Sequence, residues 1–97
     1  MTYLENKKSI RMLKAKVYGK VQGVWFRKYT FDCANRFGIV GAVKNLHDGT
    51  VIVHARGKNL KEFKKYLKSG PPDSDVYKID YSWDTPKMEF SEFKVEY

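Results

Sequence analysis

The chain has 97 residues, 42% of them hydrophobic and 15% aromatic, which is enough apolar material for one hydrophobic core and no more. Lysine and arginine outnumber aspartate and glutamate by 19 to 11, a balance that favours an acidic small molecule or a nucleic acid as partner. A membrane span and a signal-peptide core are excluded by the absence of any long apolar segment, and the single cysteine excludes an internal disulfide, so we expect a cytoplasmic protein.

The first predicted elements are a tail, a strand and a helix. Residues 1–11 are polar and are expected to form a flexible N-terminal tail, whereas residues 12–97 are expected to form one domain. Apolar and polar residues alternate over residues 13–17, which predicts a half-buried strand. A helix follows a glycine-containing loop and ends at Gly38. The residues at helical spacing on its inner face are Phe26, Tyr29, Cys33, Ala34 and Phe37.

The middle of the chain predicts a hairpin followed by a second helix. Residues 39–46 have strand character, residues 47–50 (His-Asp-Gly-Thr) are typical of a turn, and residues 51–56 alternate again. The second helix begins after Asn59, a predicted N-cap, and ends at the Gly-Pro-Pro of residues 70–72. The residues on its inner face are Leu60, Phe63 and Leu67.

The last part of the chain predicts two further strands. A fourth strand runs from Val76 to Trp83 and is interrupted at Thr85-Pro86. Phe90, Phe93 and Val95 indicate a short closing strand. The order is therefore βαββαβ with a short extra C-terminal strand, and right-handed crossovers place both helices on one face of a mixed, largely antiparallel sheet. The predicted fold is α+β, a ferredoxin-like two-layer sandwich.

The loop before the first helix has the composition of an anion-binding site. Residues 19–27 read Gly-Lys-Val-Gln-Gly-Val-Trp-Phe-Arg. Gly19 and Gly23 can adopt left-handed conformations that turn backbone N–H groups toward an anion. The following helix N-terminus also favours negative charge, and Arg27 in its first turn adds a planar fork that matches phosphate or carboxylate. Because a cation there opposes the helix dipole, we expect Arg27 to have an anionic partner.

These residues closely resemble the acylphosphatase family, whose signature is Gly-x-Val-Gln-Gly-Val-x-Phe-Arg. A second family signature is similar to residues 41–45 (Gly-Ala-Val-Lys-Asn) followed by residues 48–51 and Gly57. The Gly-Pro-Pro of residues 70–72 also resembles the family. The resemblance covers residues 12–97, about the whole predicted domain, and long motifs on the expected elements make it specific.

The chain departs from the family pattern at two positions. Ala42 stands where the family usually has an aromatic residue, and Leu46 stands where a hydroxyl residue is frequent. We expect these departures to affect packing beneath the site and the positioning of Asn45, and therefore the rate more than the reaction.

The resemblance implies hydrolysis of an acyl phosphate to a carboxylate and inorganic phosphate. By analogy with the family, Arg27 and backbone N–H groups of the loop hold the phosphoryl oxygens, and Asn45 orients the attacking water. The loop residues implied are Gly19, Lys20, Val21, Gln22, Gly23 and Val24. The reaction would need no metal, cofactor or covalent intermediate. Inorganic phosphate or sulfate is expected to bind as product or mimic, and the chain is expected to be a monomer.

Several residues have competing readings. Asn45 taken alone could equally cap the end of its strand, and Trp25 could face the substrate or cover the helix start. Cys33 lies on the inner helical face, which favours core packing. His47 and His54 have no ligand-spaced partners, so His54 is read as a solvated strand residue and no metal site is expected.

Two other classes of protein fit the layout. An RNA-recognition module shares the sheet with two helices, but residues 51–56 lack the aromatic pair that such a module uses, so nucleic acid is not the expected partner. An acylphosphatase-like domain also stands at the front of larger maturation enzymes. Because the sequence ends at Tyr97 without a following domain, a free-standing enzyme is the expectation.

Overall fold

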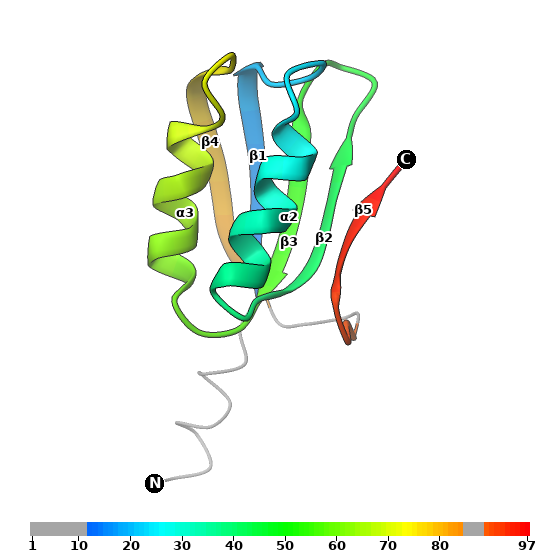
Figure 1. Cartoon of the computed structure of the whole chain (residues 1–97), viewed down its shortest axis with the longest axis vertical. Coiled ribbons are helices and arrows are strands. Elements are labelled where there is room, and N and C mark those ends of the chain that lie inside the picture. Colours follow the sequence, from blue (N-terminus) through cyan, green and yellow to red (C-terminus); the bar gives the residue numbers. More distant parts are fainter. Residues whose placement is uncertain (1–11, 85–88) are drawn as a thin grey trace, which may run out of the picture.

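The computed structural model describes residues 12–84 and 89–97 of the chain (Figure 1). The predicted tail at residues 1–11 and the predicted interruption at Thr85-Pro86 lie outside the described residues. The elements are β1 (Met12–Lys20), α2 (Phe26–Arg36), β2 (Val40–Asn45), β3 (Val51–Arg56), α3 (Leu60–Ser69), β4 (Asp75–Asp84) and β5 (Phe93–Glu96).

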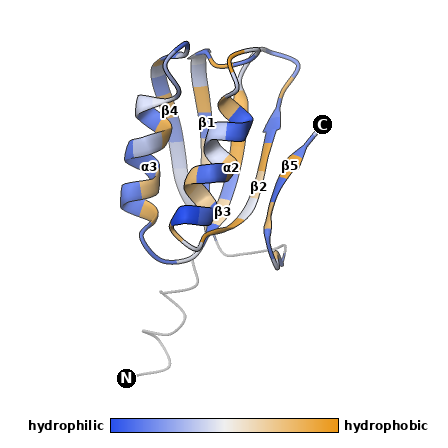
Figure 2. Ribbon diagram, viewed as in Figure 1, coloured by the Kyte–Doolittle hydropathy of each residue, from blue (hydrophilic) through white to orange (hydrophobic). Residues whose placement is uncertain are grey.

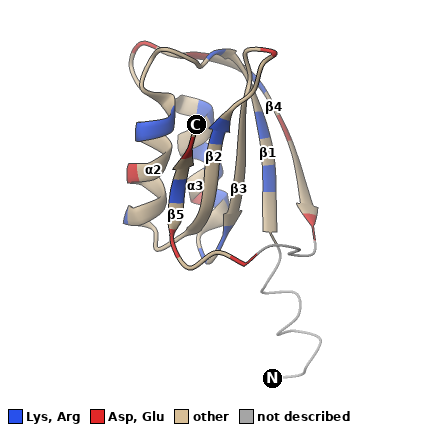
Figure 3. Cartoon of the chain, turned by 90° about the vertical axis from the view of Figure 1, so that its right-hand side faces the viewer, with Lys and Arg blue, Asp and Glu red and all other residues tan. Residues whose placement is uncertain are grey.

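The strands form one five-stranded sheet in the order β4-β1-β3-β2-β5. Its pairs are antiparallel except for β2 and β5, which run parallel. Both helices cover the same face of the sheet, as the side view in Figure 3 shows. This arrangement confirms the predicted ferredoxin-like sandwich. The closing strand begins at Phe93, which pairs with Gly41, and the predicted extension of this strand back to Phe90 is wrong.

The core lies between the helices and the sheet, where hydrophobic stretches of the strands lie behind helices whose outer surfaces are hydrophilic (Figure 2). The alternation in β1 and β3 puts their apolar residues in register across the sheet, for example Ala15 opposite Val53 and Val17 opposite Val51. Phe63 of α3 packs edge-on against Phe93 of β5, with 6.3 Å between ring centroids. Each such buried side chain contributes about 1.5–3 kcal/mol to folding.

Both helices begin at a residue in a left-handed conformation. Trp25, at φ 65°, precedes α2, and Asn59, at φ 61°, precedes α3. Asn59 is the predicted N-cap, but its side chain makes no capping hydrogen bond, because such a bond forms from extended backbone. The first turn of α2 contains no acidic residue, so its N–H groups and dipole are not balanced by a local carboxylate.

The predicted turn at residues 47–50 joins β2 to β3 and is held by Asp48. The Asp48 carboxylate accepts hydrogen bonds from the Thr50 hydroxyl and from the Thr50 backbone N–H, the latter at 3.0 Å. The Lys16 ammonium of β1 lies 3.0 Å from the same carboxylate. The Thr50 hydroxyl first, and then Lys16, lower the pKa of Asp48 from 3.8 to about 2.

The turn is therefore expected to weaken in acid. Because the folded pKa of Asp48 is lowered, its contribution to stability is present above its unfolded pKa of 3.8 and is lost as the pH falls through about 2. We expect the melting temperature of Asp48→Asn to fall less than that of the wild type across this window, as measured by circular dichroism. Asp73→Asn, in the turn before β4, is the control. Identical pH profiles for the wild type and Asp48→Asn would contradict the role of Asp48.

Candidate active site

The loop between β1 and α2 is shorter than predicted. Gly19 and Lys20 are the last residues of β1 and pair with Val76 and Asp75 of β4. At Gly19, φ is 132° and a Cβ atom would collide with the Asp75 carbonyl, so β4 explains the glycine. Gly23 has φ 74° and open space around its α-carbon, so it serves the loop itself. The sequence reading of Gly19 as a loop glycine is thus wrong.

Three side chains hold this loop in place. Val21 and Val24 are buried in the core, which fixes the backbone on either side of Gln22. The Gln22 amide nitrogen (Nε2) donates to the carbonyls of Leu46 at 2.8 Å and of Thr50 at 2.9 Å. These bonds tie the loop to the β2–β3 turn. The sequence reading gave Gln22 a backbone role only, and no local signal marks its partners, which lie 24 and 28 positions away.

Removing the Gln22 amide is expected to destabilise the fold. A net contribution of about 0.5–1.5 kcal/mol for each hydrogen bond predicts that Gln22→Met, which keeps the stem but has no donor, loses roughly 1–3 kcal/mol. The free energy of unfolding, measured in urea, tests this value. A variant as stable as the wild type would show that the two hydrogen bonds have no net effect on stability.

Arg27 lies in the first turn of α2 and reaches the end of β5. Its Nη1 donates to the Glu96 carbonyl at 3.1 Å, and its guanidinium carbon lies 4.5 Å from the centre of the Tyr97 ring. Among residues 12–84 and 89–97, no carboxylate forms an ion pair with Arg27. The local acidic partner that a structural arginine would have is therefore not found in the described part of the chain, and most of the guanidinium donors are left for another anion.

Asn45 is the last residue of β2 and lies opposite Val51. Its Oδ1 atom is buried and accepts no hydrogen bond from any described residue. Burying an amide oxygen without a partner costs free energy, so such an atom in a native protein usually has a functional role or an ordered water as partner.

Arg27 and Asn45 line the same cavity, which has a volume of about 520 Å³. Its complete lining is Val21, Gly23, Trp25, Phe26, Arg27, Lys28, Phe31, Asn45, Val95 and Tyr97. The structure thus brings together both predicted catalytic residues and two of the six predicted loop residues. The other four loop residues, Gly19, Lys20, Gln22 and Val24, do not line it. The sequence reading did not include Phe31, Val95 and Tyr97.

Ala42 and Leu46, the two departures from the family pattern, do not line this cavity. Ala42 lies opposite His54 and alternates with the buried Val43, so it faces the side of the sheet away from the helices. Leu46 contributes its backbone, whose carbonyl accepts from Gln22 and whose N–H donates to Thr50 at 2.9 Å. Because these bonds use the main chain, the missing hydroxyl at position 46 leaves them in place.

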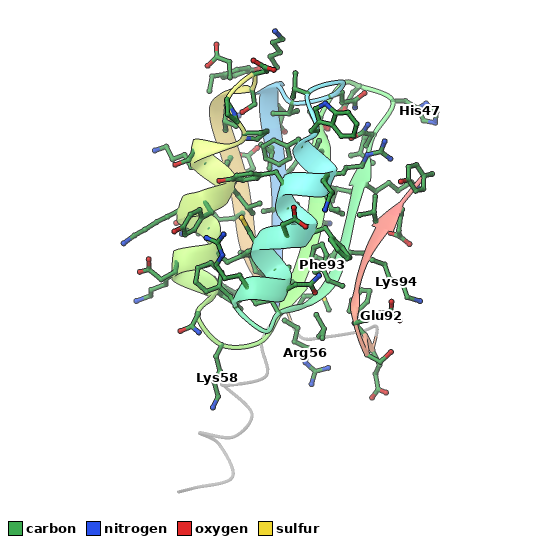
Figure 4. All side chains as sticks on the ribbon, in the orientation of Figure 1. His47, Arg56, Lys58, Glu92, Phe93 and Lys94 are labelled. Atoms are coloured by element: carbon green, nitrogen blue, oxygen red, sulfur yellow. The ribbon has the colours of Figure 1, made fainter. Side chains whose placement is uncertain are left out.

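The remaining titratable candidates lie away from the cavity. His47 projects from the β2–β3 turn (Figure 4). His54 is half-buried, which corrects the prediction of a solvated residue. Its burial, and after that the positive charge of Lys14, lower the pKa of its imidazole. Cys33 is buried and unpaired in the core, as predicted. Among the described residues, no group of three His, Cys, Asp or Glu side chains could hold a metal ion, and no helix could cross a membrane.

The chain is similar over most of its length to known proteins. The sequence model of the acylphosphatase family matches residues 13–95. An acylphosphatase of Dehalococcoides mccartyi is 44% identical over 88 residues, which cover 88% of this chain and 97% of the relative. Human acylphosphatase-2 is 38% identical over 94 residues, covering 92% of this chain and 95% of the relative. The crystal structure of Bacillus subtilis acylphosphatase superposes with a TM-score of 0.86 at 31% identity, covering 91% of this chain and all (100%) of that one. The chain therefore belongs to the acylphosphatase family, whose enzymes hydrolyse acyl phosphates.

Proposed function

We propose that this enzyme hydrolyses the carboxyl–phosphate anhydride of small acyl phosphates by direct attack of a positioned water, without a metal ion or a covalent intermediate. The observation that carries the proposal is that Arg27, the β1–α2 loop and Asn45 line one cavity. Membership of the family supports the reaction, and the arrangement of these groups supports the roles given to them.

The phosphoryl group binds where residues of the loop and of the start of α2 line the cavity. Arg27 offers a charged planar fork with only one of its N–H donors engaged by the Glu96 carbonyl. The backbone N–H groups of residues 21–24 and the positive end of the α2 dipole add further donors. Charge builds up on the equatorial phosphoryl oxygens in the transition state, where preorganised donors stabilise it most.

Asn45 orients the water. Its buried Oδ1 accepts a hydrogen bond from the water molecule, which attacks phosphorus as the bond from phosphorus to the carboxyl oxygen breaks. An amide is too weak a base to take the proton, so the proton passes to a phosphoryl oxygen of the substrate. The products are a carboxylate and inorganic phosphate. The carboxylate is stable enough to leave without a general acid.

A continuous assay with benzoyl phosphate tests the proposal, with 4-nitrophenyl phosphate as the phosphomonoester control. We expect hydrolysis of the first compound only, unchanged activity in EDTA, and competitive inhibition by inorganic phosphate and by sulfate. Failure to hydrolyse benzoyl phosphate would reject the function. Loss of activity in EDTA would reject the metal-free scheme alone. Competition between an oligonucleotide and phosphate would favour the nucleic-acid alternative.

The proposed enzyme acts as a monomer, since each group assigned a role lies within one chain. Light scattering of the purified protein is expected to give the chain mass of 11.4 kDa. A mass of twice that value at assay concentrations would contradict this part of the proposal.

A further inference from the structure

The cavity lined by Arg27 and Asn45 is also lined by aromatic and apolar side chains. These residues are Trp25, Phe31, Val95 and Tyr97, and the Arg27 guanidinium lies 4.5 Å from the centre of the Tyr97 ring. We propose that these four residues form a subsite for the acyl group and that the enzyme therefore prefers aromatic over small acyl groups. The inference rests on the proposed function, because the acyl group reaches these residues only when the phosphoryl group is bound at Arg27.

Trp25 has a large exposed ring on a strained backbone. The residue is 79% exposed, and its φ of 65° is a conformation that costs a non-glycine residue free energy. Within the described residues, its ring makes no aromatic or cation–π contact that would repay this cost. Such strain is found where a side chain is needed at one place for function. Here that place is the rim of the cavity, directly after the loop.

Tyr97 places a second ring beside Arg27. The residue is 92% exposed, yet the centre of its ring lies 4.5 Å from the Arg27 guanidinium carbon. The preceding Glu96 carbonyl accepts a hydrogen bond from the same guanidinium, which ties the end of β5 to the site. An acyl group that extends from a phosphoryl group on Arg27 therefore meets the Tyr97 ring.

Phe31 and Val95 add apolar surface to the same cavity. Both are partly buried and pack against the hydrophobic core, so they are held in place from below. The nearby Lys28 ammonium is 2.9 Å from the Asp32 carboxylate, and this ion pair offsets its charge. Apolar lining of this kind suits an apolar acyl group better than one with a second negative charge. The cavity volume of about 520 Å³ lies within the range of about 300–1,000 Å³ typical of small-molecule sites.

The contribution of each ring should appear as substrate preference. A well-placed contact between two aromatic rings is worth about three- to tenfold in binding beyond simple burial. A phenyl group can make such contacts with Trp25 and Tyr97, whereas an acetyl group cannot. The quantity that isolates this effect is the ratio of kcat/KM for benzoyl phosphate to kcat/KM for acetyl phosphate, relative to the same ratio for the wild type.

The test measures this ratio in Trp25→Gly and Tyr97→Ala, with Trp25→Phe and Tyr97→Phe as conservative variants. Glycine is chosen at position 25 because it adopts the observed φ without strain. Tyr77→Ala is the matched control, since Tyr77 is an exposed tyrosine on β4, 74% exposed and outside the cavity. We expect the ratio to fall roughly three- to tenfold in Trp25→Gly and in Tyr97→Ala. It should stay near the wild-type value in both phenylalanine variants and in Tyr77→Ala.

The outcomes separate the subsite from the proposed function. A wild-type chain that hydrolyses neither substrate overturns the function and the subsite with it. If the wild type hydrolyses both but the ratio is unchanged in Trp25→Gly and Tyr97→Ala, the subsite alone is overturned. An equal loss for both substrates also overturns it, because Tyr97 would then act only by positioning Arg27. Both substituted side chains are exposed, so the variants are expected to fold, which circular dichroism checks.

Discussion

Replacing Arg27 with glutamine is expected to lower kcat/KM for benzoyl phosphate by roughly a hundredfold or more. The substitution removes the positive charge and the planar fork while keeping a polar side chain at the start of α2. Because the proposed mechanism has the guanidinium contact the phosphoryl group before and during the reaction, binding of the product should weaken as well. The inhibition constant of inorganic phosphate should therefore rise together with the loss of turnover.

Arg36→Gln is the matched control for Arg27. Arg36 lies in the last turn of α2, outside the cavity, so the same charge change there should leave both constants near the wild-type values. Arg27→Lys separates charge from shape, since lysine keeps the charge but loses the fork that matches a phosphoryl group. Near wild-type activity in Arg27→Gln would show that the loop N–H groups suffice without the guanidinium.

Replacing Asn45 with alanine is expected to have a different signature. In the proposed mechanism the amide contacts the attacking water and not the phosphoryl group, so kcat should fall by roughly a hundredfold or more while the inhibition constant of phosphate changes little. The variant should also be at least as stable as the wild type, because it removes a buried oxygen that has no partner among the described residues. Kinetics, phosphate inhibition and a melting curve on one preparation test all three expectations.

Asn35→Ala, on α2 away from the cavity, controls for loss of an asparagine amide. Full activity in Asn45→Ala would overturn the water-positioning role. A large rise in the phosphate inhibition constant would instead place the Asn45 amide on the phosphoryl group. The two substitutions are informative together. Arg27→Gln should weaken phosphate binding and lower turnover, whereas Asn45→Ala should lower turnover alone.

The order and type of the elements could be predicted from the sequence because they follow from local patterns. Alternation over residues 51–56 requires one buried face, and the spacing of Leu60, Phe63 and Leu67 requires a helix with one apolar side. The glycine-containing loop and the position of Arg27 in the first turn of a helix could be predicted for the same reason. Placing Asn45 near Arg27 needed the family resemblance, since its residue type and position also fit a strand end.

Features that depend on partners distant in the chain were decided by the tertiary structure. Gly19 is required by the approach of β4, and Gln22 finds its acceptors on the β2–β3 turn. Tyr97 reaches Arg27 because β5 pairs with β2 beside α2, a juxtaposition of residues 70 positions apart in the numbering. No local sequence pattern predicts such contacts, because they form only when the strands are ordered in the sheet and the helices are packed against it. The sequence by itself determined the elements and the glycine-containing loop proposed to bind the phosphoryl group, and the fold decided what surrounds that loop.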